Sequence, residues 1–513
     1  MAKYEGFIGG AYQMDSLPID TQRCINWYPE IPGSKDAVTM KSLRPTPGYS
    51  QWFDFTGLTG VYAGAFVRGL YRTTKGLGTV NPDPNGSVIC VVGTGVFWVK
   101  NPTTAQLLGQ VSALVTEVYM IDDGVGLVIS DGVHLYRLDL VTLSFLQVTF
   151  SLNAPLQLAY QGGRTITMGN VDGAPSNAFF WSEIDHNEQW DALSYASAES
   201  SADPINGILV NGSYLWLFGP NSYECWSPTN DINLPWQRSF AAAGTIGLKA
   251  PRSLLSVGGR VVFLGSTTQG SPVAYMSTGG TDFIKISTPA LDREWSTTDV
   301  TDCTTFGYSD KGHTFVVFNF DTLDKTYVYD ISDGQGGEWH QRASRDPNTN
   351  LLHRWAPQFC TQYNGLTLMG DRNTPRLYEV DESILTENGV MIQRIRTTAH
   401  LHAAQHYMRV QSVTFDMETG TGISTQDPVN PLTGLNRQYQ APTVMLRYSW
   451  DYGRTYSSEL RQTFGRMGEY RSVLQFRKLG QGRDFCTEFK LTDPCRTTII
   501  NGWVDVEEGG QRT

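Results

Sequence analysis

The sequence predicts an all-β protein made of a β-propeller of six to eight blades, with a count that favours seven, and a C-terminal β-sandwich-like domain. Three observations support this prediction: the composition, a unit that recurs along the chain, and the loss of that unit near the C-terminus. Of the 513 residues, 52 are glycine, 12% are aromatic and only 17% are charged. This composition is typical of many short strands joined by tight turns.

A recurring unit of strand, turn and strand runs through the middle of the chain. Each copy begins with a turn glycine and a short apolar strand, and a second strand with an aromatic residue follows, as in "YVYD" from Tyr327. The copies are spaced by 38 to 53 residues, and their turn glycines are Gly86, Gly124, Gly163, Gly212, Gly259, Gly312 and Gly365. Four short strands at this spacing are typical of a propeller blade.

The hydrophobic pattern of the unit fits a propeller. A single blade cannot bury both of its faces, so blades pack side by side around an axis and leave only short edges. The inner strands are nearly continuous apolar runs, as expected of strands covered on both faces, whereas the outer strands alternate. A set of stacked β-sandwiches with similar turn spacing is the alternative.

Three segments follow from this pattern. Residues 1–55 contain many prolines and glycines and are predicted to form an irregular arm that packs on another domain. Residues 56–400 are predicted to form the propeller. Residues 401–513 keep strand patterns without the repeat and are predicted to form a β-sandwich-like platform domain. The polar loop 419–440 is of a length that is often functional or mobile, and the sequence leaves its role open.

The net charge of −11 is unevenly distributed. Residues 391–513 hold 15 Lys and Arg against 12 Asp and Glu, whereas residues 1–390 hold 24 against 38. A chain this acidic is a poor candidate for binding a phosphate backbone, because such affinity comes from Lys and Arg that displace counterions. It can still surround DNA without adhering to it.

Cysteine usage and hydropathy indicate a protein made in a cytoplasm and without a membrane span. The N-terminus carries no apolar segment of signal-peptide length, and no stretch approaches eighteen apolar residues. The cysteines form no CxxC pair and are odd in number, which argues against a zinc site and against a disulfide framework. Buried reduced thiols are expected at Cys24, Cys90, Cys225, Cys303, Cys360, Cys486 and Cys495.

The sequence shows no catalytic, cofactor-binding or metal-binding set, so we predict none of these and no enzymatic activity. It has neither a phosphate-binding glycine loop nor a nucleophile elbow. His400, His402 and His406 form a cluster, but no carboxylate or cysteine adjoins them in sequence, so surface or interface histidines are expected. The stretch "SWDYGRTY" (449–456) has the form of an Asp-box, which serves as a hairpin turn.

The polar stretch "TYVYDISDGQGGEWHQR" (326–342) is predicted to be scaffold rather than a catalytic loop. If its strands are regular, Tyr327 and Tyr329 lie on one face and Val328 on the other. Trp339 is expected to pack between blades, with His340 and Arg342 on the opposite face. The same strand, turn and strand occur in the other copies with different polar residues, whereas catalysis would require a particular set.

Several stretches together resemble the tail nozzle family of short-tailed phages, also called packaged-DNA stabilisation or tail hub proteins. The stretches are "CINWYPE" (24–30), "LRPTPG" (43–48), "SYLWLFGPNSYECW" (213–226), "GLKAPRSLLSVGGRVVFLG" (247–265), "GHTFVVFNFDTLDKTYVYD" (312–330) with "EWHQR" (338–342), "MGDRNTPRLYEVDESILTENG" (369–389), "RIRTTAHL" (394–401) and the run from 444 to 480. They occur in the expected order over roughly residues 20–505. The polar loop 419–440 has no counterpart among them.

The resemblance implies a non-enzymatic structural protein of the virion tail, assembled in the host cytoplasm. Six copies would form a ring below the portal and its adaptor and would extend the DNA exit channel. The ring would retain packaged DNA, contact it without reading its sequence, and dock tailspikes or tail fibres. The alternative is a propeller that binds or hydrolyses glycans, which the aromatic-rich turns and the Asp-box motivate.

Overall fold

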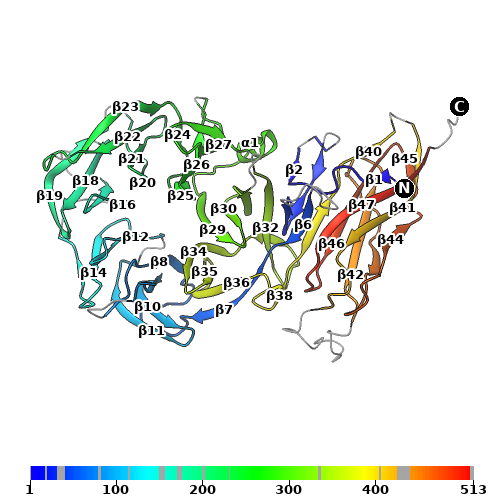
Figure 1. Ribbon diagram of the computed structural model, residues 1–513, viewed down its shortest axis with the longest axis horizontal. Coiled ribbons are helices and arrows are strands. Elements are labelled where there is room, and N and C mark those ends of the chain that lie inside the picture. Colours follow the sequence, from blue (N-terminus) through cyan, green and yellow to red (C-terminus); the bar gives the residue numbers. More distant parts are fainter. Residues whose placement is uncertain are drawn as a thin grey trace.

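The computed structural model describes most of the chain and shows a ring of small sheets beside a β-sandwich (Figure 1). The described residues are 2–14, 16–17, 20–31, 41–78, 83–113, 116–149, 156–169, 176–198, 201, 203–229, 231–267, 269–332, 337–403, 406–423 and 440–508.

The first four sheets of the ring each consist of four consecutive antiparallel strands. The first contains β8 (Val67–Arg72), β9 (Val88–Val92), β10 (Gly95–Asn101) and β11 (Thr104–Gln110). The second contains β12 (Tyr119–Asp122), β13 (Gly126–Ser130), β14 (Leu135–Asp139) and β15 (Phe145–Gln147). The third contains β16 (Leu158–Gln161), β17 (Arg164–Met168), β18 (Ala178–Glu183) and β19 (His186–Ser197). The fourth contains β20 (Gly207–Asn211), β21 (Tyr214–Phe218), β22 (Tyr223–Pro228) and β23 (Trp236–Gly244).

The remaining three sheets are elaborated versions of the same plan. The fifth contains β24 (Gly247–Leu248), β25 (Leu255–Val257), β26 (Arg260–Ser266), β27 (Pro272–Ser277) and β28 (Phe283–Lys285), with the short helices η1 (Pro251–Ser253) and α1 (Pro289–Trp295) beside it. The sixth contains β29 (Thr304–Asp310), β30 (His313–Phe320), β31 (Lys325–Asp330), β32 (Trp339–Arg345) and β33 (Leu352–Arg354). The seventh contains β34 (Pro357–Tyr363), β35 (Leu366–Asp371), β36 (Arg376–Asp381) and, from the N-terminal segment, β7 (Gly48–Asp54).

The innermost strands of these sheets contact one another around a closed circle. β8 contacts β12, and the contacts continue through β16, β20, β25, β29 and β34, which contacts β8 again. The described residues therefore form a propeller of seven sheets, within the predicted range of six to eight. The alternative of stacked sandwiches is wrong.

The turn glycines that mark the repeat lie in the hairpin between the first and second strands of each sheet. All seven have φ between 60° and 92°, a left-handed conformation that favours glycine. The apolar strand after each glycine is thus the second strand from the axis. β9, β13 and β17 are buried along their whole length, because neighbouring blades cover both of their faces.

The N-terminal segment contains more regular structure than predicted. It forms the hairpin of β2 (Tyr12–Gln13) and β3 (Thr21–Gln22), and also β4 (Cys24–Ile25), β5 (Trp27–Glu30), β6 (Ser42–Pro45) and β7. β7 pairs antiparallel with β36, and so the N-terminal segment supplies the fourth strand of the seventh blade. The expectation of an irregular arm is wrong for these strands, because β4, β6 and β7 pair with strands more than 300 residues further along the chain.

The sandwich consists of two sheets around a shared apolar core. One sheet contains β5, β6, β47 (Ile499–Glu508), β41 (Met408–Met417) and β44 (Leu474–Arg477), with β1 (Ala2–Lys3) and β45 (Gln481–Gly482) at its sides. The other contains β39 (Arg394–Thr397), β40 (Leu401–His402), β46 (Asp484–Leu491), β42 (Thr443–Ser449) and β43 (Leu460–Thr463). The connection from the propeller passes through β37 (Thr386–Glu387) and β38 (Val390–Met391).

The second sandwich sheet is continuous with the sixth blade. β4 pairs with β32 on one side and with β39 on the other, so hydrogen bonding runs from the propeller into the sandwich. In Figure 1 the blue N-terminal strands occupy this region between the two bodies.

The seven cysteines are free thiols, six of them buried and Cys360 half-buried. None of the described helices has the length and apolar character needed to cross a bilayer.

Asn26 connects the two domains through its side chain. It is buried in a left-handed conformation with φ of 57°. Its Nδ2 donates to the carbonyls of Ala343 (2.9 Å) and Gln393 (2.8 Å), and its Oδ1 accepts from the backbone amide of Ala343 (3.0 Å). The amide side chain therefore joins β32 of the propeller to the segment that enters the sandwich.

We predict that Asn26→Ala lowers the free energy of unfolding by about 3 kcal/mol, because it removes three hydrogen bonds and leaves alanine in a left-handed conformation. Urea denaturation measures this change. The matched control is Asn388→Ala, since Asn388 is exposed, has φ of 46° and forms no side-chain hydrogen bond among the described residues. The control is expected to lose only about 1 kcal/mol; equal losses in the two variants would contradict the prediction.

Candidate functional site at the propeller axis and the domain junction

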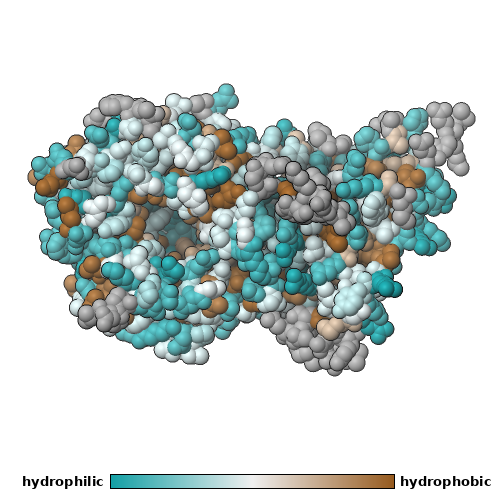
Figure 2. Space-filling view, in the orientation of Figure 1, coloured by the Kyte–Doolittle hydropathy of each residue, from teal (hydrophilic) through white to brown (hydrophobic). Residues whose placement is uncertain are grey.

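The innermost strands surround a pocket of about 210 Å³ at the propeller axis. Residues of β8, β12, β29 and β34 contribute to its wall, together with Arg252 of η1 and Leu254. The space-filling view is hollowed at the middle of the propeller (Figure 2). Such a convergence of strands from several blades is where a propeller commonly carries functional side chains.

Side chains from three blades meet across this axis. Glu117, just before β12, forms an ion pair with Arg252 at 3.1 Å and accepts a hydrogen bond from Gln358 of β34. Burial raises the pKa of Glu117, while the positive charges of Arg252 and Arg372 act to lower it. The second and fifth blades lie on opposite sides of the ring, so the ion pair bridges the axis.

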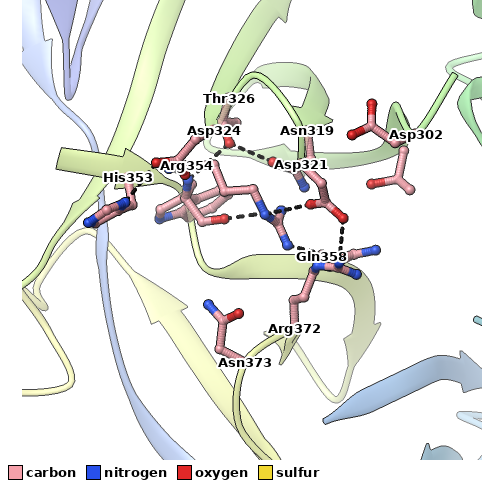
Figure 3. Close-up of polar contacts among 12 residues, drawn as sticks. Asp302, Asn319, Asp321, Asp324, Thr326, His353, Arg354, Gln358, Arg372 and Asn373 are labelled. Carbon is pink, nitrogen blue, oxygen red and sulfur yellow. Dashed lines mark hydrogen bonds and ion pairs between the residues drawn. The ribbon is translucent and has the colours of Figure 1, made fainter. Parts of the chain in front are cut away.

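A network of ion pairs extends from the axis between the sixth and seventh blades (Figure 3). Asp321, which follows β30, accepts from Arg354 Nε at 2.8 Å and from Arg372 at 2.5 Å. Arg354 also donates to Gln358 Oε1 at 2.8 Å. Each carboxylate oxygen of Asp321 thus faces a guanidinium group, an arrangement that holds loops together and leaves no free acid or base.

A histidine and a carboxylate also lie at the rim of this network. His353 Nδ1 and Asp324 Oδ2 are 2.7 Å apart, and Asp324 Oδ1 accepts from the backbone amide of Arg354 at 2.9 Å. Both side chains are half-exposed. Among the described residues, no serine, threonine or cysteine side chain hydrogen-bonds to His353, so the pair does not activate a nucleophile there.

The polar contacts continue from the axis to the domain junction. Trp355, next to Arg354, donates its Nε1 hydrogen to Glu387 Oε1 at 3.1 Å. Burial raises the pKa of Glu387 to about 7, although hydrogen bonds and the charge of Arg394 oppose this shift. Arg394 is fully buried, and none of its three guanidinium nitrogens has a hydrogen-bond partner among the described residues.

The strands of the polar stretch 326–342 pack within and between blades as predicted, over their described part. Tyr327, Tyr329 and Trp339 share one apolar core with the fifth blade, and Val328 lies in another. Trp339 is buried and donates to the carbonyl of Ile286 at 2.8 Å, so it does pack between blades. Residues 333–336 lie outside the described part.

The opposite face of this strand carries His340 and Arg342, also as predicted. The Arg342 guanidinium lies against the ring of Trp355, 4.8 Å from its centroid, and is enclosed by further aromatic rings. Burial, with the nearby charge of Arg342, lowers the pKa of His340 well below its usual value. His340 is therefore neutral at physiological pH and serves the packing of the blade.

The histidine cluster is separated by the fold. His402 and His406 are exposed, as predicted, but the expectation is wrong for His400, whose side chain is buried. Its Nδ1 lies 2.9 Å from Asp484 Oδ1, and its Nε2 lies 2.8 Å from the carbonyl of Leu17. Burial would lower the pKa of His400, but the hydrogen bond and charge of Asp484 raise it overall.

Cys486 completes a group of three possible donor atoms that lie within 4.8 Å of one another. Asp484 and Cys486 are two residues apart on β46 and thus share a face of that strand. The pairing of β40 with β46 brings His400 to them. Sequence spacing could not have shown this, because more than 80 residues separate the histidine from the other two.

The Asp-box forms the turn that its sequence predicts. Asp451 accepts hydrogen bonds from the backbone amide of Thr455 at 2.8 Å and from its hydroxyl at 2.6 Å. These bonds lower the pKa of Asp451 to about 2. Ser449 accepts from the amide of Gly453 at 3.0 Å. Most of the polar loop 419–440, from 424 to 439, lies outside the described residues.

The described residues thus define a protein made of a propeller and a sandwich, in which many buried polar side chains hold strands and blades together. Two family models match the chain: "Bacteriophage P22 Gp10, beta-propeller" over residues 25–385 and "Bacteriophage P22 Gp10, beta-sandwich" over residues 393–507. The chain belongs to the bacteriophage P22 Gp10 family, the tail nozzle or packaged-DNA stabilisation proteins. The predicted family and the predicted fold class are thereby confirmed, and the family is one of structural components of the phage tail.

Other comparisons are more remote. No curated protein sequence matches the chain. The extracellular domain of a hybrid two-component system from B. thetaiotaomicron is 10% identical, with a TM-score of 0.42 over 84% of this chain and 48% of that chain. BamB from Moraxella catarrhalis is 12% identical, with a TM-score of 0.33 over 62% of this chain and 97% of that chain. The chain thus spans about half the length of the first of these two proteins.

The Asp321–Arg354 ion pair is expected to stabilise the ring measurably. In a double-mutant cycle with Asp321→Asn and Arg354→Met, we predict a coupling energy of about 2 kcal/mol, because the arginine is buried and its partner largely so. Chemical denaturation of the four proteins measures it. The half-exposed pair Asp324 and His353, changed to Asn and Gln, is the control and should give about 0.5 kcal/mol or less. Similar coupling in both cycles would contradict the prediction.

Glu387 is expected to make stability depend on pH. Because its pKa in the folded state is about 7, above the unfolded value of about 4.3, its contribution is fully present at low pH and is lost as pH rises through 7. Glu387→Gln removes this titration. We therefore predict that the stability of the variant relative to wild type rises by about 3 kcal/mol between pH 5 and pH 8. Urea denaturation across this range measures it, and a difference that is constant with pH would refute it.

Proposed function

We propose that this protein is the subunit of the tail nozzle of a short-tailed phage. Six copies form a ring below the portal and its adaptor protein and extend the channel through which the genome leaves. The ring retains packaged DNA until infection and docks tailspikes or tail fibres on its outside. It is assembled in the host cytoplasm and carries out no catalysis.

The observation that carries this proposal is the pair of consecutive family matches, which together run from residue 25 to residue 507. A single propeller match would have left function open, because propellers serve many purposes. Here the sandwich model of the same family matches the residues that follow the propeller match. The two matched segments follow the ring and the sandwich of the structure, except that β5 and β6 lie within the propeller match but belong to a sandwich sheet.

The charge of the chain supports a passage for DNA. Six copies at −11 each amount to about −66, and a wall of this sign repels a polyanion instead of binding each phosphate. Double-stranded DNA is then a cargo that is contacted without sequence readout. Such repulsion allows the duplex to slide during ejection.

The propeller axis of one subunit is not this passage. The Glu117–Arg252 ion pair and the Glu117–Gln358 hydrogen bond cross the axis, and the pocket there measures only about 210 Å³. A duplex cannot enter so small a space. The DNA channel therefore lies between copies, around the axis of the ring.

Electron microscopy of the purified protein or of the virion tail tests the proposal. A sixfold ring with an axial channel is expected, together with no retention of duplex DNA on the isolated ring at 0.15 M salt. Monomers, or a ring of another symmetry, would refute it. The glycan-binding alternative would be supported by retention on a glycan array; among the described residues, the Asp451 carboxylate of the Asp-box is already engaged in its turn.

A further inference from the structure

Two surfaces of opposite charge lie at opposite ends of the molecule. The acidic edge, residues 183–193, contains four carboxylates and no Lys or Arg. The basic edge, residues 459–483, contains six Lys and Arg against two carboxylates. In Figure 1, β19 of the acidic edge lies at the far left of the propeller and β44 of the basic edge lies on the right of the sandwich.

The acidic edge presents an unpaired strand. β19 is the outermost strand of the third blade, and no strand of the described residues pairs with its outer side. It is twelve residues long, longer than the other strands of the ring. Leu193 is 83% exposed and Ile184 is 47% exposed beside the carboxylates. A long open edge with apolar side chains is a surface that another chain can cover.

The basic edge has the same features with the opposite charge. β43 and β44 are the last strands of the two sandwich sheets, and they contact each other. The connection between them carries Tyr470, Val473 and Met467, which are 73%, 67% and 50% exposed. Tyr, Met and Arg are the residues that protein interfaces favour.

Some of the basic charge is already neutralised within the chain. Arg461 pairs with Glu459, and Arg466 lies 3.7 Å from Glu469. Arg471 and Arg477 are exposed and form no ion pair with described residues, which leaves them available to an acidic partner.

We propose that the acidic edge of one copy binds the basic edge of the next copy in the ring. The occupant of each surface is thus a second copy of this chain. The two edges have opposite net charge, and each offers exposed apolar side chains and open strand edges. Because the two edges are different surfaces, their contact is heterologous, and such an interface builds a closed ring when the rotation between neighbouring copies closes. This inference rests on the proposed function and identifies the surfaces that join the subunits.

Charge reversal tests the contact. The acidic edge is reversed by Glu183→Arg with Asp191→Arg, and the basic edge by Arg471→Glu with Arg477→Glu; all four side chains are exposed. Each double variant places like charges opposite each other, so the subunit concentration for half-assembly at 0.1 M salt should rise about 100-fold or more. Analytical ultracentrifugation measures it, and circular dichroism checks that each variant is folded.

A quadruple variant that combines the two double variants tests whether the two edges contact each other directly. It carries both reversals, so opposite charges face each other again and the ring should return. A control with Lys3→Glu and Asp282→Arg, two exposed changes outside both edges, should assemble like wild type.

The outcomes separate this inference from the proposed function. If wild type forms no ring, the proposed function fails. If wild type and both double variants form rings, the ring stands and the edge-to-edge contact is wrong. It is also wrong if the quadruple variant stays dissociated, or if the basic-edge variant loses affinity for a 30-base-pair duplex while its ring persists, which would assign that edge to nucleic acid.

Discussion

The structure depends on hydrogen bonding between the N-terminal strands and sheets formed by residues hundreds of positions later. β7 supplies the last strand of the seventh blade, and β4 continues the sixth blade into the sandwich. β5 and β6 join the other sandwich sheet. Because one short segment enters both bodies, it completes the seventh blade, and the two domains share a continuous network of backbone hydrogen bonds.

Buried polar groups in this protein are mostly engaged with one another, which explains why a chain rich in them has the character of a scaffold. Asp321 faces two arginines, Glu117 faces Arg252 and Gln358, and Arg342 lies among aromatic rings. A charge removed from water stabilises a fold only when its partners replace the lost hydration. Here the partners come from different blades, so the same contacts that satisfy each charge also fix one blade against another.

The two domains differ in the sign of their net charge. The propeller carries most of the negative charge, which in the proposed nozzle would keep a polyanion from adhering, whereas the sandwich carries a small positive excess that is concentrated near β43 and β44. In the proposed ring, a uniformly acidic subunit would repel its own copies. Concentrating basic residues in one segment would allow attraction between the proposed subunits while the remaining surface stays acidic.

The sequence by itself determined the features that repeat locally. The seven turn glycines, the apolar second strands, the two faces of the strands around Trp339 and the Asp-box turn all follow from spacing and residue type, and the structure has each of them. Only the tertiary structure decided that the N-terminal segment is strand, that Glu117 meets Arg252 across the axis, and that His400 lies beside Asp484 and Cys486. The physical reason is that these contacts join residues far apart in the chain, where the periodicity of neighbouring residues carries no information about which distant group will supply the hydrogen bond or the opposite charge.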